Sequence, residues 1–238
     1  MRRLLPALLL LLLPAGPASA GLRAVYGSSE ESRTLIVEIA DDGDARIAES
    51  GDESYGLMIG GHFYVVSRQD GAWMAARIGD VAAAIDRVMP PIFGDALTHG
   101  GPARPVAQLH VEQRGERIVG GRKGMVWSVS GIAGAANGKP AEYVMSGDDD
   151  LKPVGRVLEQ FMHASIIPGA PLLGSAAAEL IEETRAIFAL GTPLDVGGRF
   201  QLRYVEKADL GGDRFALPVV PATVDQLVAA MPRPPAGQ

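Results

Sequence analysis

The chain of 238 residues contains no cysteine. This absence excludes a disulfide scaffold, a thiolate zinc site and a cysteine nucleophile. It also excludes the acylated cysteine that would follow the signal segment of a bacterial lipoprotein. The fold must therefore rest on its own apolar core, and the chain is long enough for one domain of ordinary size.

A second long apolar run is also missing. Residues 1–20 start with Arg2 and Arg3, continue with an apolar run over 4–13 and end in Ala18-Ser19-Ala20. This pattern predicts a secretory signal peptide cleaved after Ala20, and hence a periplasmic or secreted protein. The run is shorter than the roughly 20 apolar residues that span a bilayer. A retained N-terminal anchor is the alternative, and we expect no transmembrane span in the mature chain.

Basic residues are outnumbered by acidic ones. The chain has 22 Lys and Arg against 28 Asp and Glu; without Arg2 and Arg3 there are 20 against 28, a net charge of −8. Nucleic-acid partners favour a basic face, so none is expected. The same balance argues against a general attraction to anionic membrane surfaces.

Catalytic and metal-binding motifs are scarce. No Gly-x-Ser-x-Gly elbow occurs, and no pair of histidines has metal-ligand spacing among His62, His99, His110 and His163. Residues 148–150 are three consecutive aspartates, which could bind calcium. The interpretation that we favour is a helix start, since acids favour the positive end of the helix dipole and Pro153 suits a first turn. We expect no metal and no cofactor.

Glycine clusters raise one more possibility. Residues 120–124, Gly-Gly-Arg-Lys-Gly, could form a backbone nest for an anion beside two basic side chains. A plain turn between two strands is the favoured interpretation, because glycine clusters mainly mark turns.

Most of the chain reads as short strands with turn residues between them. Alternation and β-branched residues predict strands over 22–26, 34–39, 45–49, 55–59, 62–67, 72–77, 106–112, 117–119, 125–129, 141–145, 199–205 and 214–217. A helix over 81–88 is expected to be capped by Asp80 and ended by Pro90, and another helix is expected over 222–231. Strands at this spacing indicate an antiparallel meander.

Two amphipathic helices interrupt the strands between residues 148 and 188. Apolar residues recur there at three- and four-residue spacing, which is a helix period. Each helix needs an apolar surface, and the strands can supply one, so the sequence predicts an α+β fold. The two stripes are Val154, Val157, Leu158, Phe161, Met162 and Leu173, Ala177, Leu180, Ile181, Thr184, Ile187, Phe188.

The last third of the chain carries a family-like pattern. Gly191-Thr192-Pro193-Leu194 precedes a strand that ends at Val205-Glu206-Lys207-Ala208, and Phe215-Ala216-Leu217-Pro218 follows. Residues 118–129, with Trp127 near the centre of a strand, look like an earlier part of the same pattern. The chain thus resembles an uncharacterised exported bacterial family related to the periplasmic lipoprotein-carrier (LolA-like) superfamily. Many members have a cysteine where this chain has Gly124 nearby.

This resemblance implies a strongly curved antiparallel half-barrel sheet with helices packed on its concave face. The half-barrel domain would span residues 21–218, followed by a short helix and a loose tail over 219–238. In better-known relatives the space between sheet and helices holds acyl chains. None of the polar residues that those carriers use is matched here.

We therefore expect non-catalytic binding of an apolar ligand by a monomer. The ligand would be an acyl chain, a lipid or a lipidated protein. The alternative is an envelope structural or interaction module with a filled core and a protein partner; an enzyme using Asp148 and His110 has the weakest basis. The expected ligand-binding residues are Trp73, Met74, Val154, Leu158, Phe161, Met162, Leu180, Ile187 and Phe188.

Overall fold

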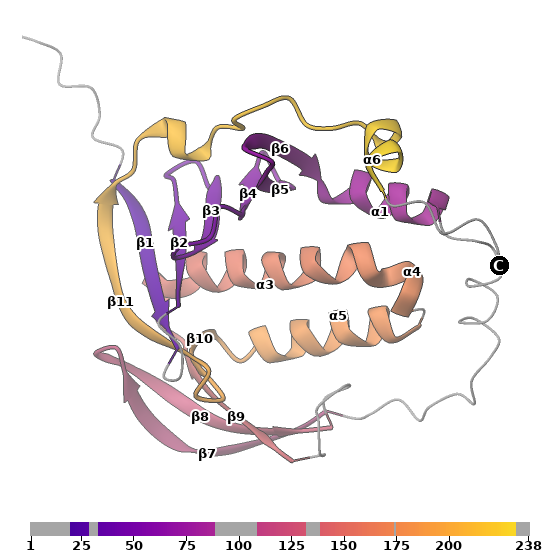
Figure 1. The fold of residues 1–238 in the computed structure, drawn as a ribbon. Helices are drawn as coiled ribbons and strands as arrows, with labels where there is room; N and C mark the ends of the chain where they lie inside the picture. Colours follow the sequence, from indigo (N-terminus) through magenta and orange to yellow (C-terminus); the bar gives the residue numbers. More distant parts are fainter. Residues whose placement is uncertain (1–19, 29–32, 89–108, 132–138, 174, 232–238) are drawn as a thin grey trace, which may run out of the picture.

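The computed structural model describes residues 20–28, 33–88, 109–131, 139–173 and 175–231. It combines helices with an 11-stranded antiparallel sheet, which confirms the predicted α+β class (Figure 1). The predicted signal segment lies outside the described residues except for Ala20, the first residue of the first strand.

The first six strands form a meander in sequence order, as predicted. They are β1 (Ala20–Gly27), β2 (Thr34–Ile39), β3 (Ala45–Glu49), β4 (Tyr55–Ile59), β5 (His62–Gln69) and β6 (Ala72–Arg77). Tight turns connect most of them, and Asp70-Gly71 takes positive φ values as an Asp-Gly hairpin turn requires. Turn chemistry and alternation together were therefore sufficient to locate these strands.

The other five strands depart further from expectation. They are β7 (His110–Val119), β8 (Arg122–Ser130), β9 (Ala141–Ser146), β10 (Thr192–Val196) and β11 (Phe200–Asp209). Residues 110–112 and 117–119 of two predicted strands join in β7, whose pairing with β8 is interrupted between Gln113 and Gly115. The start of the first predicted strand, residues 106–108, lies outside the described residues. Alternation does not predict β10, because Thr192 to Asp195 are all buried.

The sheet is open. Its strand order is β6-β5-β4-β3-β2-β1-β11-β10-β9-β8-β7, so β6 and β7 are the two edges. The chain thus returns from the β7 side of the sheet through β10 to β11, which pairs with β1 at the centre. Only two residue pairs join β10 to β11, Asp195 with Gln201 and Val196 with Phe200.

The helices are α1 (Ile78–Val88), α3 (Lys152–Ile166), α4 (Ala170–Leu173), α5 (Ser175–Phe188) and α6 (Val224–Ala230), with 3₁₀ turns η2 (Asp149–Leu151), η3 (Ile167–Gly169) and η4 (Gly212–Phe215). Two predictions are corrected. Asp80 lies inside the first turn of α1 and does not cap it. Residues 214–217 form no strand; the chain turns at η4, where Phe215 is buried.

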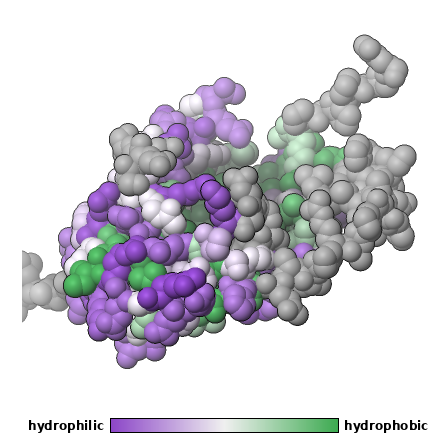
Figure 2. All heavy atoms as spheres, turned by 90° about the horizontal axis from the view of Figure 1, so that it is seen from below, coloured by the Kyte–Doolittle hydropathy of each residue, from purple (hydrophilic) through white to green (hydrophobic). Residues whose placement is uncertain are grey.

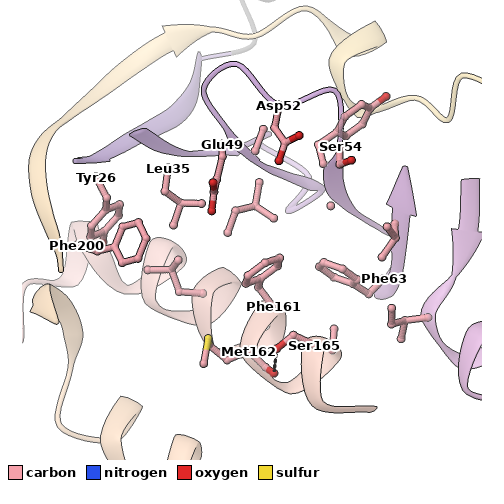
Figure 3. A pocket seen from close by; sticks show the side chains of 18 of the residues that line it. Tyr26, Leu35, Glu49, Asp52, Ser54, Phe63, Phe161, Met162, Ser165 and Phe200 are labelled. Atoms are coloured by element: carbon pink, nitrogen blue, oxygen red, sulfur yellow. Dashed lines mark hydrogen bonds between the residues drawn. The ribbon is translucent and has the colours of Figure 1, made fainter. Parts of the chain in front are cut away.

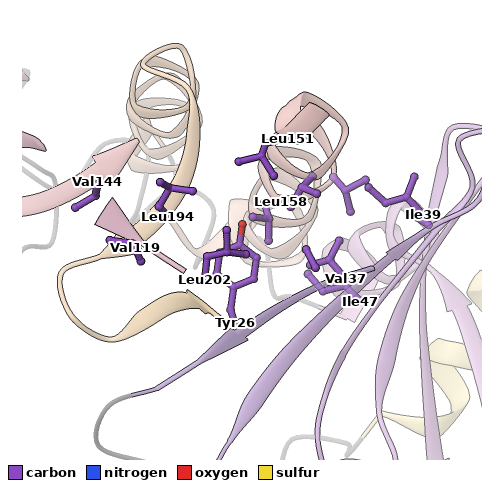
Figure 4. Close-up of a cluster of buried hydrophobic side chains, with 14 of the residues drawn as sticks. Tyr26, Val37, Ile39, Ile47, Val119, Val144, Leu151, Leu158, Leu194 and Leu202 are labelled. Carbon is purple, nitrogen blue, oxygen red and sulfur yellow. The ribbon is translucent and has the colours of Figure 1, made fainter. Parts of the chain in front are cut away.

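The main core lies between α3 and the sheet (Figure 4). Val154, Val157 and Leu158 of α3, with Leu151 of the preceding turn η2, face the strand residues. These include Tyr26, Val37, Ile39, Ile47, Leu194 and Leu202. Helix α5 lies beside α3 (Figure 1). We call the sheet face that carries this core the inner face.

Helix α3 approaches β10 unusually closely at Gly155. A Cβ built on Gly155 would lie 2.5 Å from the Thr192 hydroxyl oxygen. That hydroxyl donates a hydrogen bond of 3.0 Å to the Leu151 carbonyl oxygen. The glycine thus sets the distance between helix and strand, and the hydrogen bond holds the first turn of the helix against β10.

The opposite, outer face carries a buried carboxylate. Glu38 is 1% exposed and accepts hydrogen bonds from Arg23 and Arg214, while an Arg46 nitrogen lies 3.5 Å away. Arg23 and Arg46 are its cross-strand neighbours on β1 and β3. Arg214 comes from η4, so the ion-pair group ties the last segment of the chain to the sheet.

That segment, the C-terminal strap (residues 210–231), crosses the outer face to the β6 edge of the sheet (Figure 1). Leu217 packs with the buried Leu57, and the Ala222 amide donates to the Ala75 carbonyl of β6. Helix α6 then packs on α1 through Leu227. Hydrophilic side chains cover much of the described surface on the side where β7 and β8 lie (Figure 2).

Candidate functional site

A cavity of about 520 Å³ lies between α3 and the inner face of the sheet (Figure 3). Tyr26 and Phe200 lie at one end and Phe63 lies toward the other, with Phe161 of α3 between them. The rings of Phe63 and Phe161 are in contact, with their centroids 5.8 Å apart. The cavity therefore continues the main core along the helix instead of forming a separate chamber.

The lining is mainly apolar and comes from both layers. The sheet contributes inward-facing residues, and α3 contributes the residues that follow its buried core positions. The apolar part of the lining includes Tyr26, Leu35, Ile47, Phe63, Val65, Leu158, Phe161, Met162, Phe188, Pro193, Val196 and Phe200. Val65 is 38% exposed and Met162 is 43% exposed, so the apolar lining reaches the protein surface.

Tyr26 closes part of this lining with its hydroxyl turned away from solvent. The hydroxyl donates a hydrogen bond of 3.0 Å to the Pro193 carbonyl oxygen. Burial raises the pKa of Tyr26, because the phenolate form would lose its hydration. Tyr26 is therefore neutral across the physiological range and presents its ring to the cavity as an apolar surface.

Two carboxylates lie at the cavity on the sheet side. Glu49 is the last residue of β3 and pairs with Leu35 of β2. Leu35 pairs on its other side with Tyr26 of β1. Asp52 lies in the turn after β3, where its amide donates to the Glu49 carbonyl at 3.3 Å. Among the described residues that line the cavity, these two are charged and none is basic.

Four of the nine predicted site residues line the cavity. They are Leu158, Phe161, Met162 and Phe188. The helix period therefore pointed to part of the helical lining of this cavity. Whether these residues bind a ligand stays a prediction.

The other five are not among the lining residues. Val154 is fully buried in the core one turn before the cavity begins, and Leu180 and Ile187 of α5 are half-buried elsewhere. Met74 is a half-buried residue of β6. Trp73 shares a strand face with Ala75, which packs in the Leu57 cluster with Leu217 of the strap. It lies on the outer face, where Arg68 covers its ring at 5.8 Å.

The sheet half of the lining was missed. Tyr26, Leu35, Ile47, Phe63 and Val65 each belong to a strand that was predicted with the right position. Their alternation identifies the apolar face of each strand. It does not distinguish residues that touch α3 from residues that border an open space, because both are apolar and inward-facing.

The residues considered for a calcium site and for an anion-binding nest have structural roles. Asp148, Asp149 and Asp150 start the helical segment, and Arg122 lies 2.7 Å from Asp150. Lys152 lowers the pKa of Asp149 through a side-chain hydrogen bond and through its positive charge. Gly120 and Gly121 form the turn between β7 and β8, as favoured. In the part of the chain that the structure describes, no three potential ligands converge on a metal site.

No family model, no curated protein and no solved structure matches the chain. None of the helices within the described ranges is both long and apolar enough to cross a membrane.

Proposed function

We propose that the protein binds, without catalysis, a ligand with an apolar chain in the cavity between α3 and the sheet. The observation that carries this proposal is the cavity itself, about 520 Å³ and lined mainly by apolar residues. Its volume lies within the roughly 300–1,000 Å³ that small-molecule sites occupy. A fully packed core, as in a purely structural module, would leave no such space.

The driving force is burial of the chain. Each methylene removed from water contributes about 0.8 kcal/mol. Lengthening the chain by two methylenes should therefore raise the affinity on the order of tenfold until the cavity is full. Amphiphiles of eight, ten and twelve carbons with one uncharged head group would test this by titration calorimetry. An affinity that is independent of chain length would contradict binding by burial.

We further propose that the open sheet is a strongly curved half-barrel with α3 and α5 on its concave face, as in the LolA-like superfamily. Two observations support this. Core residues of α3 contact strands from both halves of the sheet. The turn at Gly120, near one edge, lies against the Leu202 carbonyl of the central strand β11. The ligand would then be an acyl chain of a lipid or lipidated protein in the periplasm or outside the cell, following the signal-like N-terminus.

Blocking the cavity gives the sharpest test of the proposal. Ser165 is exposed, lines the cavity and lies on α3, so a large ring at this position would fill the space from its open side. Gln160 is exposed on the same helix and is not a lining residue. We expect S165W to lose binding of a neutral dodecyl amphiphile at least about tenfold, and Q160W to retain it.

The same pair of variants can be examined by native mass spectrometry for lipid that co-purifies. Lipid bound to the unmodified chain and to Q160W, but not to S165W, would support the proposal. Equal binding by all three proteins would place the ligand elsewhere and overturn it.

A further inference from the structure

Among the residues that the structure describes, the cavity lining combines an apolar interior with two acidic side chains and no basic one. Resting on the proposed function, we infer that the site selects amphiphiles with a cationic head group, such as an alkylammonium, over those with a carboxylate, sulfate or phosphate head. The inference concerns the charge of the ligand, which the apolar lining alone would leave open.

Glu49 carries the first part of the argument. Its cross-strand neighbour on the inner face is Leu35, which is itself paired with Tyr26. Along β3, the inward-facing residue before Glu49 is Ile47, which also lines the cavity. Glu49 is the one acid among these inner-face residues, since the others, Tyr26, Leu35 and Ile47, present apolar groups to the cavity. Figure 3 shows Glu49 beside Leu35 at the cavity. The carboxylate thus meets whatever lies along this wall.

Asp52 adds a second negative charge at the same place. It is exposed, lines the cavity and lies beside Glu49 in Figure 3. The other polar residue of this turn that lines the cavity, Ser54, is uncharged. A chain that enters the cavity would leave its head group within reach of both carboxylates, where an anion is repelled and an ammonium ion is attracted.

Two cations pair with acids beside the cavity, and both lie outside its lining. Arg33 lies 3.6 Å from one Glu49 carboxylate oxygen, and it is two-thirds exposed and outside the lining. Arg68 of β5 lies 3.2 Å from Glu53, which is on the same turn as Asp52, and Arg68 is also outside the lining. The aromatic rings of Phe63 and Phe161 add negative ring faces, which also favour a cation.

The test compares two probes with the same decyl chain: decyltrimethylammonium and decyl sulfate, both titrated below their micelle concentrations into the purified chain. We expect the ammonium probe to bind about tenfold more tightly at low salt, because two nearby carboxylates each contribute an ion-pair preference of modest size. The difference should shrink as salt is raised.

Replacing the acids by their amides separates charge from shape. In E49Q/D52N the two probes should bind with affinities within about twofold of each other, since no lining charge remains. E53Q changes an acid of the same turn that does not line the cavity, and it should keep the tenfold preference. If the double variant does not fold, D52N alone can be used, because Asp52 is exposed and its replacement disturbs no packing. D52N should reduce the preference for the ammonium probe, since it removes one of the two negative charges.

The outcomes separate this inference from the proposed function. Equal affinities of the two probes for the unmodified chain, or tighter binding of decyl sulfate, would overturn the head-group inference and leave the cavity proposal standing. Failure of both probes and of uncharged 1-decanoylglycerol to bind would overturn both.

Discussion

Glu38 is a buried carboxylate of the outer face. Its carboxylate is buried among Arg23, Arg46 and Arg214, with the shortest contact at 2.8 Å. Removing it would leave three guanidinium groups without their shared partner. The arginines are partly exposed and can recover some hydration, so we expect E38A to lower the free energy of unfolding by about 2–3 kcal/mol, measured by urea denaturation.

A neighbouring acid supplies the control. Glu206 also pairs with Arg23, at 3.3 Å, but it is about half exposed. E206A should change the free energy of unfolding by less than about 1 kcal/mol, as is usual for surface ion pairs. Similar values for E38A and E206A would show that the buried group does not hold the strap to the sheet.

Tyr26 should make stability depend on pH in alkali. Burial raises its pKa in the folded protein, whereas in the unfolded chain it is about 10. Above that pH the unfolded state loses the proton while the folded state keeps it, so the unfolded state binds fewer protons and stability falls as pH rises. Its contribution is unaffected below about pH 9.

Y26F gives the measurement. The free energy of unfolding of the unmodified chain, followed by urea denaturation from pH 8 to 11, should fall relative to that of Y26F above about pH 10. At pH 8 the variant should be less stable by about 1 kcal/mol, because the Pro193 carbonyl loses its hydrogen bond. A difference that does not vary with pH would contradict the assignment of Tyr26 as a buried neutral group.

At the scale of elements, two helical glycines should respond in opposite ways to alanine. Gly79 in α1 has nothing within 4 Å of a built Cβ, so G79A should stabilise the protein by up to about 1 kcal/mol through helix propensity. A Cβ added to Gly155 in α3 would lie 2.5 Å from the Thr192 hydroxyl oxygen. G155A should therefore be destabilising by about 1–3 kcal/mol, because α3 must move away from β10.

Thermal or urea unfolding of the two variants provides the comparison, each serving as the control of the other. Stabilisation by both substitutions would mean that α3 does not pack on β10 as closely as described. The result matters for the site, because the same helix forms one wall of the cavity.

The elements that the sequence predicts well are those with local signals. β2, β3, β4 and β6 have the predicted bounds because alternation and turn residues lie within the element itself. β10 lacks alternation because it is buried on both sides, and residues 214–217 look like a strand although Phe215 is the buried residue of a 3₁₀ turn. Both errors concern segments whose surroundings are remote in sequence.

At the scale of the whole molecule, the same distinction applies to the site. Leu158, Phe161 and Met162 were recognisable as one face of a helix, and Phe188 as part of the next. The separation between α3 and the sheet, which makes a cavity out of an apolar face, depends on strand order and on contacts such as Gly155 with Thr192. Sequence pattern carries neither, so it placed Trp73 at the site although that residue is on the outer face.

The central claim is that an apolar chain occupies the space beside Phe161. Methyl NMR of the methionines tests it directly, because Met162 lines the cavity while Met145 is 1% exposed within the sheet and does not. On titration with uncharged 1-decanoylglycerol, we expect a saturable shift of the Met162 methyl resonance, with that of Met145 nearly unchanged. Absence of a saturable shift at Met162 would contradict the account.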